Sequence, residues 1–166
     1  MLKEFEKRIL SSLVLIPTSF FFIIQGSVYF IFFLSLIFLA TTYEWLKMTK
    51  KNGLIKIFGI IFLFFSFYTA FNIREVSLNF FLLIIIVCIF TDIGGYFFGK
   101  IFKGPKLTSI SPKKTYSGTF GGFLLSIISG LITIKYLNNE IFTDKTHFFI
   151  LIFILFISFV SQIGDL

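Results

Sequence analysis

The sequence predicts an all-α fold, a polytopic transmembrane helical protein with about six helices. Of its 166 residues, 57% are hydrophobic and only 14% are charged, whereas soluble domains are roughly 45–50% apolar and about 25% charged. The apolar residues gather into long runs, and the basic residues lie in the gaps between these runs. This pattern is typical of a chain that crosses a bilayer several times.

Six apolar runs are near the ~20 residues that a helix needs to cross about 30 Å of hydrocarbon. The first, 9–25, follows the segment KEFEKR; it is too long for a signal peptide and no A-x-A-like site follows it, so we expect a retained helix. The other runs are 27–43, 55–71, 78–91, 120–137 and 148–163. We expect the short fourth run to continue through Asp92 to Phe98, with Gly94-Gly95 as the place for a break.

The basic residues predict an orientation. With the N-terminus inside, only Arg74, Lys135 and Lys145 of the 15 lysines and arginines fall in outside segments. This distribution follows the positive-inside rule and puts the loop 92–119 and the C-terminal SQIGDL in the cytoplasm, with the helices in the inner (plasma) membrane of a bacterium. The net charge of +7 therefore reflects topology, and we expect no nucleic-acid partner.

The loop 92–119 has a pattern that suits phosphate. Ser111-Pro112 favours a turn, and Lys113 and Lys114 follow directly, with hydroxyl residues and glycines leading into the fifth run. Backbone N–H groups at a helix N-terminus beside lysines and hydroxyls make a phosphate site. The alternative is a solvated loop whose lysines only touch anionic lipid headgroups.

Two carboxylates stand at run ends that we expect on the same membrane face. Asp92 follows the fourth run and Asp165 follows the sixth. A carboxylate at the edge of hydrocarbon is usually functional; the alternative is a structural acid that reaches the interface or pairs with a lysine. Since Mg²⁺ is held by one or two carboxylates plus substrate phosphates, these acids and the lysine loop indicate phosphoryl or nucleotidyl transfer at the bilayer surface.

Three blocks resemble the phosphatidate cytidylyltransferase (CDP-diacylglycerol synthase) family. D-I-G-G-Y-F-F-G-K (92–100) is similar to the family's D-[ST]-[GA]-A-Y-F-x-G-[RK], S-P-K-K-T-Y-S-G-T-F-G-G (111–122) to S-P-x-K-T-x-E-G-x-x-G-G, and S-Q-I-G-D-L (161–166) to S-Q-x-G-D-L. The likeness covers the chain from about residue 80 to the end. We therefore divide the chain into N-terminal membrane helices, 1–77, and a catalytic-type membrane region, 78–166.

The resemblance implies a reaction and its residues. The phosphate of phosphatidic acid attacks the α-phosphorus of CTP, which gives CDP-diacylglycerol and pyrophosphate and requires Mg²⁺. Asp92 and Asp165 would then serve the metal and the nucleotide as catalytic residues, with Lys114 on the phosphates. The expected substrate-binding residues are Ser111, Lys113, Thr115, Gly118 and Lys100. The expected partners are CTP, phosphatidic acid and membrane lipids, and a homo-oligomer is compatible with the sequence.

Several positions depart from the family pattern. Ile93 replaces Ser or Thr, Gly95 replaces Ala, and Ser117 stands where Glu is common. The family continues past G-D-L with further spans and acidic motifs, so we expect this chain to be the N-terminal part of a longer enzyme, inactive by itself and derived from a fragment or a broken gene.

Two other functions remain open at this point. One is a CTP-dependent lipid kinase of the polyprenol or phytol type, which would transfer the γ-phosphoryl group. The other is a small transporter or a non-enzymatic membrane scaffold. A transporter should show midplane polar residues in broken helices and internal repeats, whereas the polar groups here cluster at one predicted face, which favours an interfacial enzyme.

Overall fold

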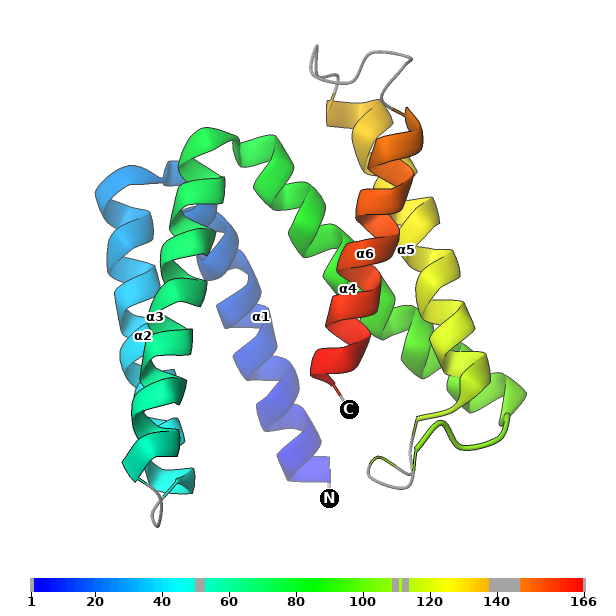
Figure 1. The fold of residues 1–166 in the computed structure, drawn as a ribbon, viewed down its shortest axis with the longest axis horizontal. Coiled ribbons are helices and arrows are strands. Elements are labelled where there is room, and N and C mark those ends of the chain that lie inside the picture. The colour runs from blue at the N-terminus through cyan, green and yellow to red at the C-terminus, as the bar shows by residue number, and fades with distance from the viewer. Residues whose placement is uncertain (1, 50–52, 109–110, 112–113, 138–146, 166) are drawn as a thin grey trace. The chain divides into compact units, whose positions relative to one another are not determined.

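The computed structural model describes residues 2–49, 53–108, 111, 114–137 and 147–165, most of which lie in helices (Figure 1). The helices are α1 Leu2–Gln25, α2 Ser27–Met48, α3 Gly53–Val76, α4 Leu78–Phe102, α5 Tyr116–Leu137 and α6 His147–Gly164. No strand occurs among the described residues, in which an isolated antiparallel bridge joins Lys106 to Thr115. The all-α prediction is therefore confirmed.

Each predicted run corresponds to one helix, but the helices extend beyond the runs. α5 begins at Tyr116 rather than at 120, and α4 ends at Phe102. α4 passes through Gly94-Gly95 without interruption, so the break considered there does not occur. As a result, the stretch between the end of α4 and the start of α5 is 103–115, shorter than the predicted loop 92–119, and Asp92 lies within a helix.

The chain divides into two compact units, Met1–Leu78 and Asn79–Leu166. In the first unit, Arg74 of α3 holds the end of α1: its Nε and Nη2 atoms donate to the carbonyl oxygens of Ile23 and Ile24, each at 3.0 Å. Its guanidinium carbon also lies 5.7 Å from the ring centroid of Phe30 in α2. The last carbonyls of a helix have no partner within that helix, so Arg74 satisfies the end of α1 and joins three helices. We call these contacts the Arg74 clasp.

The α1–α2 turn is shaped to fit this clasp. Gly26 has a φ of 65°, which favours glycine, and a Cβ atom at this position would collide with the guanidinium of Arg74. The tight turn predicted at Gln25-Gly26-Ser27 therefore has a second purpose, because it leaves room for the arginine.

The core of the second unit forms where α4, α5 and α6 meet. Leu83 and Val87 of α4 pack with Ile150 and Ile154 of α6. Isoleucines of α5 and α6 cover this cluster: Ile127, Ile134 and Ile157. The cluster fixes the three helices that carry the sequence blocks described above.

Glycines let α4 and α5 cross in backbone contact. A Cβ atom at Gly94 would collide with the carbonyl oxygen of Gly121, and a Cβ atom at Gly118 would lie 2.6 Å from the carbonyl oxygen of Gly95. A glycine inside a helix costs about 1 kcal/mol relative to alanine. The close crossing offsets this cost, which explains why α4 continues where the sequence alone offered a break.

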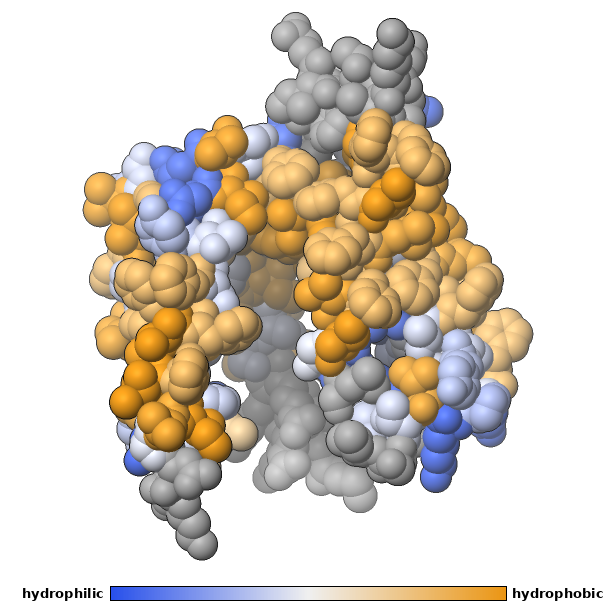
Figure 2. Space-filling view, in the orientation of Figure 1, coloured by the Kyte–Doolittle hydropathy of each residue, from blue (hydrophilic) through white to orange (hydrophobic). Residues whose placement is uncertain are grey.

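Hydrophobic side chains cover most of the visible surface of each unit (Figure 2). Among the described residues, α2, α3, α4 and the segment Tyr116–Tyr136 are long and apolar enough to cross a membrane, and the apolar parts of α1 and α6 are shorter. Large apolar side chains are exposed on every helix. Such exposure is stable when the surrounding solvent is hydrocarbon, so the chain is an integral membrane protein.

Candidate active site

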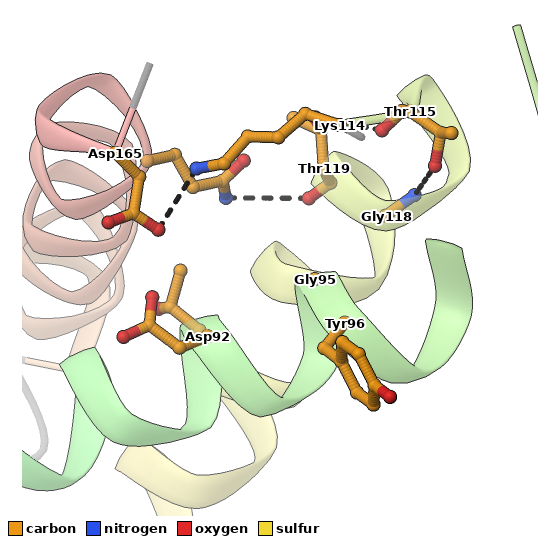
Figure 3. A pocket seen from close by; sticks show the side chains of 10 residues that line it. Asp92, Gly95, Tyr96, Lys114, Thr115, Gly118, Thr119 and Asp165 are labelled. Atoms are coloured by element: carbon orange, nitrogen blue, oxygen red, sulfur yellow. Dashed lines mark hydrogen bonds and ion pairs between the residues drawn. The ribbon is translucent and has the colours of Figure 1, made fainter. Parts of the chain in front are cut away.

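A pocket in the second unit gathers most of the predicted chemical groups (Figure 3). It has a volume of about 230 Å³ and lies between the later half of α4, the start of α5 and the end of α6. Its lining residues are Thr91, Asp92, Gly95, Tyr96, Lys114, Thr115, Gly118, Thr119, Gln162 and Asp165. The fold therefore brings together parts of all three sequence blocks, although the blocks are far apart along the chain.

Asp92 enters this pocket from α4. Its carboxylate is exposed and interacts electrostatically with both Asp165 and Lys114. Figure 3 shows the carboxylates of Asp92 and Asp165 directed toward the same space. A carboxylate on a membrane helix is costly unless a charged partner or ligand compensates it, and two carboxylates side by side suit a cation.

Backbone pairing between two arms of the segment 103–115 positions Lys114. The N–H of Leu107 donates to the carbonyl oxygen of Lys114 at 2.8 Å, and the N–H of Tyr116 donates to the carbonyl oxygen of Pro105 at 3.1 Å. These bonds hold the backbone on either side of the lysine. Its side chain is then free to extend across the pocket toward α6.

Lys114 and Asp165 form an ion pair there. The Nζ atom of Lys114 lies 2.9 Å from Oδ2 of Asp165, and the two side chains are 29% and 54% exposed. Pairs exposed to this extent contribute only about 0–1 kcal/mol. The ion pair therefore keeps both side chains at the pocket. It is weak enough to break, so that the lysine can bind a phosphate and the carboxylate can bind a metal ion.

Thr115 caps the N-terminus of α5. Its Oγ1 accepts a hydrogen bond from the N–H of Gly118 at 3.2 Å, as an N-cap threonine does. The N–H of Tyr116 is also bonded, to Pro105. The phosphate site expected at this helix N-terminus is therefore not formed by these two N–H groups, because both already have acceptors. Among the described residues that line the pocket, Lys114 supplies the positive charge.

Hydroxyl and amide groups join α6 to α4 and α5 beside the pocket. Thr91 and Ser158 are buried, with their hydroxyl oxygens 3.0 Å apart. The Nε2 atom of Gln162 donates to the carbonyl oxygen of Thr119 at 3.4 Å. Breaking such buried bonds leaves unsatisfied polar groups. Because Thr91 immediately precedes Asp92, the bonds also hold the helices that carry the two carboxylates.

The predicted site residues fall into three groups. Five line the pocket together: Asp92, Lys114, Thr115, Gly118 and Asp165. Lys100 and Ser111 do not line it; the Nζ of Lys100 lies 3.4 Å from the hydroxyl of Tyr96, and the carbonyl of Ser111 accepts the N–H of Lys114 in a turn. Lys113 lies outside the described residues.

The structure adds lining residues that the sequence did not single out for the site: Thr91, Gly95, Tyr96, Thr119 and Gln162. Helical spacing offered a signal for two of them, because residues three or four apart share a helix face. Tyr96 is four residues after Asp92, and Gln162 is three before Asp165. Thr91 contributes through its hydrogen bond to Ser158 of α6, and no pattern in the sequence around Thr91 indicates that partner.

The donor set of the pocket fits a hard divalent cation that is shared with a substrate. Asp92 and Asp165 provide the carboxylate oxygens. In the described part of the chain, no group of three or more His, Cys, Asp or Glu side chains could hold a metal ion alone. Mg²⁺ is commonly bound by one or two carboxylates with substrate phosphates and water. These residues therefore suit a magnesium ion bound jointly by protein and nucleotide.

Comparisons with known proteins identify relatives of this chain. A model of the cytidylyltransferase family matches residues 53–166, which include the whole pocket. The phosphatidate cytidylyltransferases of Rickettsia typhi and Rickettsia felis are 31% and 29% identical to this chain, over 96% of its length and 72% of theirs. That of Staphylococcus epidermidis is 32% identical over 65% of this chain and 38% of its own. No solved structure matches. On the strength of the family match and these relatives, the chain belongs to the cytidylyltransferase family.

Proposed function

We propose that this protein transfers CMP from CTP to phosphatidic acid, giving CDP-diacylglycerol and pyrophosphate. The observation that carries the proposal is the convergence of Asp92, Lys114 and Asp165 on one pocket between the later half of α4, the start of α5 and the end of α6. A nucleotide from water and a lipid from the bilayer can both reach such a place. Relatives named phosphatidate cytidylyltransferase, which align along 96% of the chain, support this choice of substrates.

The proposed reaction is a displacement at phosphorus. A phosphate oxygen of phosphatidic acid bonds to the α-phosphorus of CTP, and the bond from that phosphorus to the oxygen bridging the α- and β-phosphates breaks. Pyrophosphate leaves with the electron pair. Lys114 would bind the triphosphate oxygens as a compact positive charge, in exchange for its contact with Asp165.

Asp92 and Asp165 would hold the magnesium ion. When bound, Mg²⁺ supplies positive charge that neutralises phosphate oxygens and favours departure of pyrophosphate. The protein's own contribution is alignment: the bond between Thr91 and Ser158 fixes α4 against α6, so that the two carboxylates face one space.

Isotope labels test this function directly. Membranes that contain the complete product of the reading frame are given phosphatidic acid, Mg²⁺ and CTP labelled at the α- or the γ-phosphorus. We expect the α-label to enter lipid and the γ-label to leave in pyrophosphate. Asp92→Asn should reduce incorporation by about 10²-fold or more, a loss typical of removing one transition-state electrostatic contact. Glu44→Gln, at an exposed acid of α2 outside the pocket, is the matched control.

Two results would contradict the proposal in different ways. Entry of the γ-label into lipid would make the protein a lipid kinase. If Asp92→Asn incorporated the α-label into lipid as well as the unaltered protein does, the CMP transfer would stand, but Asp92 would not be part of the active site.

A further inference from the structure

A tyrosine and a lysine on α4 form a pair that the mechanism above does not use. The Nζ atom of Lys100 lies 3.4 Å from the hydroxyl of Tyr96 and 5.5 Å from the centroid of its ring. The two residues are four apart on one helix, so they occupy the same face. Their contact combines a hydrogen bond with a cation–π interaction, and it holds the ammonium group against Tyr96, which lines the pocket.

The pair lies at the border between the pocket and the apolar surface of α4. Tyr96 lines the pocket one helical turn after Asp92, yet it is 70% exposed, and in Figure 3 its ring extends away from the carboxylate of Asp92. Ile93 and Phe97, on the adjoining side of the helix, are 48% and 56% exposed. A lipid that covers this apolar surface would therefore meet Tyr96 and Lys100 before it reached Asp92.

The chemistry of the pair suits the headgroup of such a lipid. Tyrosine and lysine keep their apolar parts against hydrocarbon and their polar ends at headgroup level. The ammonium and the phenolic hydroxyl can both donate hydrogen bonds to phosphate oxygens. Among the described residues no carboxylate forms an ion pair with Lys100, whereas Lys114 is paired with Asp165.

We infer that Tyr96 and Lys100 bind the phosphate monoester of the lipid substrate, while Lys114 serves the nucleotide. This inference rests on the proposed function and deepens it, because the reaction joins two anions: Lys114 lines the pocket, and Lys100 contacts Tyr96, which also lines it. Along the axis of α4, Tyr96 lies about 6 Å and Lys100 about 12 Å from Asp92, which is one and two helical turns. A lipid phosphate bound by this pair would lie on the same helix as Asp92, one to two turns away.

Kinetics that separate the two substrates test the inference. The complete protein is assayed in mixed micelles, with the surface fraction of phosphatidic acid and the CTP concentration varied independently. We expect Lys100→Met to raise the KM for phosphatidic acid about tenfold and to leave that for CTP within about twofold, because it removes one charged hydrogen bond to phosphate. Tyr96→Phe should raise the lipid KM by a smaller factor, about threefold, and Lys100→Arg should restore most of the affinity.

Lys103→Met is the matched control, because this nearby lysine is also exposed, whereas the contact with Tyr96 belongs to Lys100. A rise in the KM for CTP with Lys100→Met would assign the pair to the nucleotide and overturn the inference. An equal effect of Lys103→Met would show general attraction to anionic surfaces and would also overturn it. So would kinetics that Lys100→Met leaves unchanged.

A measurement without turnover separates this inference from the proposed function. Micelles containing a photoreactive phosphatidic acid are irradiated with the protein, and the labelled peptide is identified by mass spectrometry. We expect labelling within residues 92–102 that falls at least threefold with Lys100→Met and not with Lys103→Met. That result would support the lipid site even if no CMP transfer were found, whereas labelling that ignores Lys100 would overturn the site even in an active enzyme.

Discussion

Lys114 and Asp165 bind each other, although each is also a residue proposed to bind a ligand. The same contact that orders the pocket therefore competes with the lysine's phosphate and with the carboxylate's metal ion. A ligand that takes one partner releases the other. Nucleotide and magnesium should thus bind with positive coupling, limited by the small free energy of an exposed pair, about 0–1 kcal/mol.

The coupling can be measured by removing the lysine. Lys114→Met should raise the affinity for Mg²⁺ in the absence of nucleotide by about two- to fivefold, because it removes both a competitor for Asp165 and a repelling charge. The same change should weaken CTP binding. Calorimetric titration with each ligand measures both effects, with Lys103→Met as the control. Weaker magnesium binding by Lys114→Met would show that the lysine does not compete for the carboxylate.

At the scale of elements, the crossing of α4 and α5 decides whether the pocket forms. The pocket lies directly beside that crossing, and Gly95 and Gly118 belong to both. A helix separation larger by one methyl group would displace Asp92 from Lys114 and Thr115. The glycines of the sequence blocks therefore act through backbone distance rather than through contact with a substrate.

Two alanine substitutions at this crossing should behave differently. A Cβ atom at Gly118 would lie 2.6 Å from the carbonyl oxygen of Gly95, whereas a Cβ atom at Gly95 would lie 3.8 Å from that of Gly118. We expect Gly118→Ala to lower the free energy of unfolding by about 1–3 kcal/mol through overpacking. Gly95→Ala should be neutral or stabilising by up to about 1 kcal/mol, since alanine is the better helix former. Unfolding in detergent, followed by circular dichroism, compares them; equal effects would contradict the crossing as described.

The fold was predictable from the sequence to a greater extent than the site. The bilayer fixes the length of a spanning helix, so the apolar runs located each of the six helices among the described residues. Asp92, Lys114 and Asp165 were singled out because their blocks have distinctive patterns, and the fold brings them to one pocket. Gly94 was misinterpreted, since a glycine considered alone indicates a break, while here its environment is set by Gly121 of another helix. Contacts of this kind depend on tertiary structure, which no local pattern contains.

At the scale of the whole molecule, the proposed orientation places the pocket on the cytoplasmic side. In a Cys88→Ser background, which removes the single native cysteine, one cysteine is introduced at Lys47, Val76, Lys103 or Lys135, all of which are exposed. A membrane-impermeant maleimide applied to intact cells should label positions 76 and 135 only. After permeabilisation, 47 and 103 should react as well. The reverse pattern would invert the orientation derived from the positive-inside rule.

The Arg74 clasp gives the first unit an order of assembly. Ile23 and Ile24 are synthesised 51 and 50 residues before Arg74, so their carbonyl oxygens precede the guanidinium that later binds them. Until then, the end of α1 is incompletely bonded and the hairpin of α1 and α2 is unfinished. Once α3 is complete, the side chain of Arg74 joins α1, α2 and α3. The order in which the helices are synthesised is therefore also the order in which they become fixed to one another in the membrane.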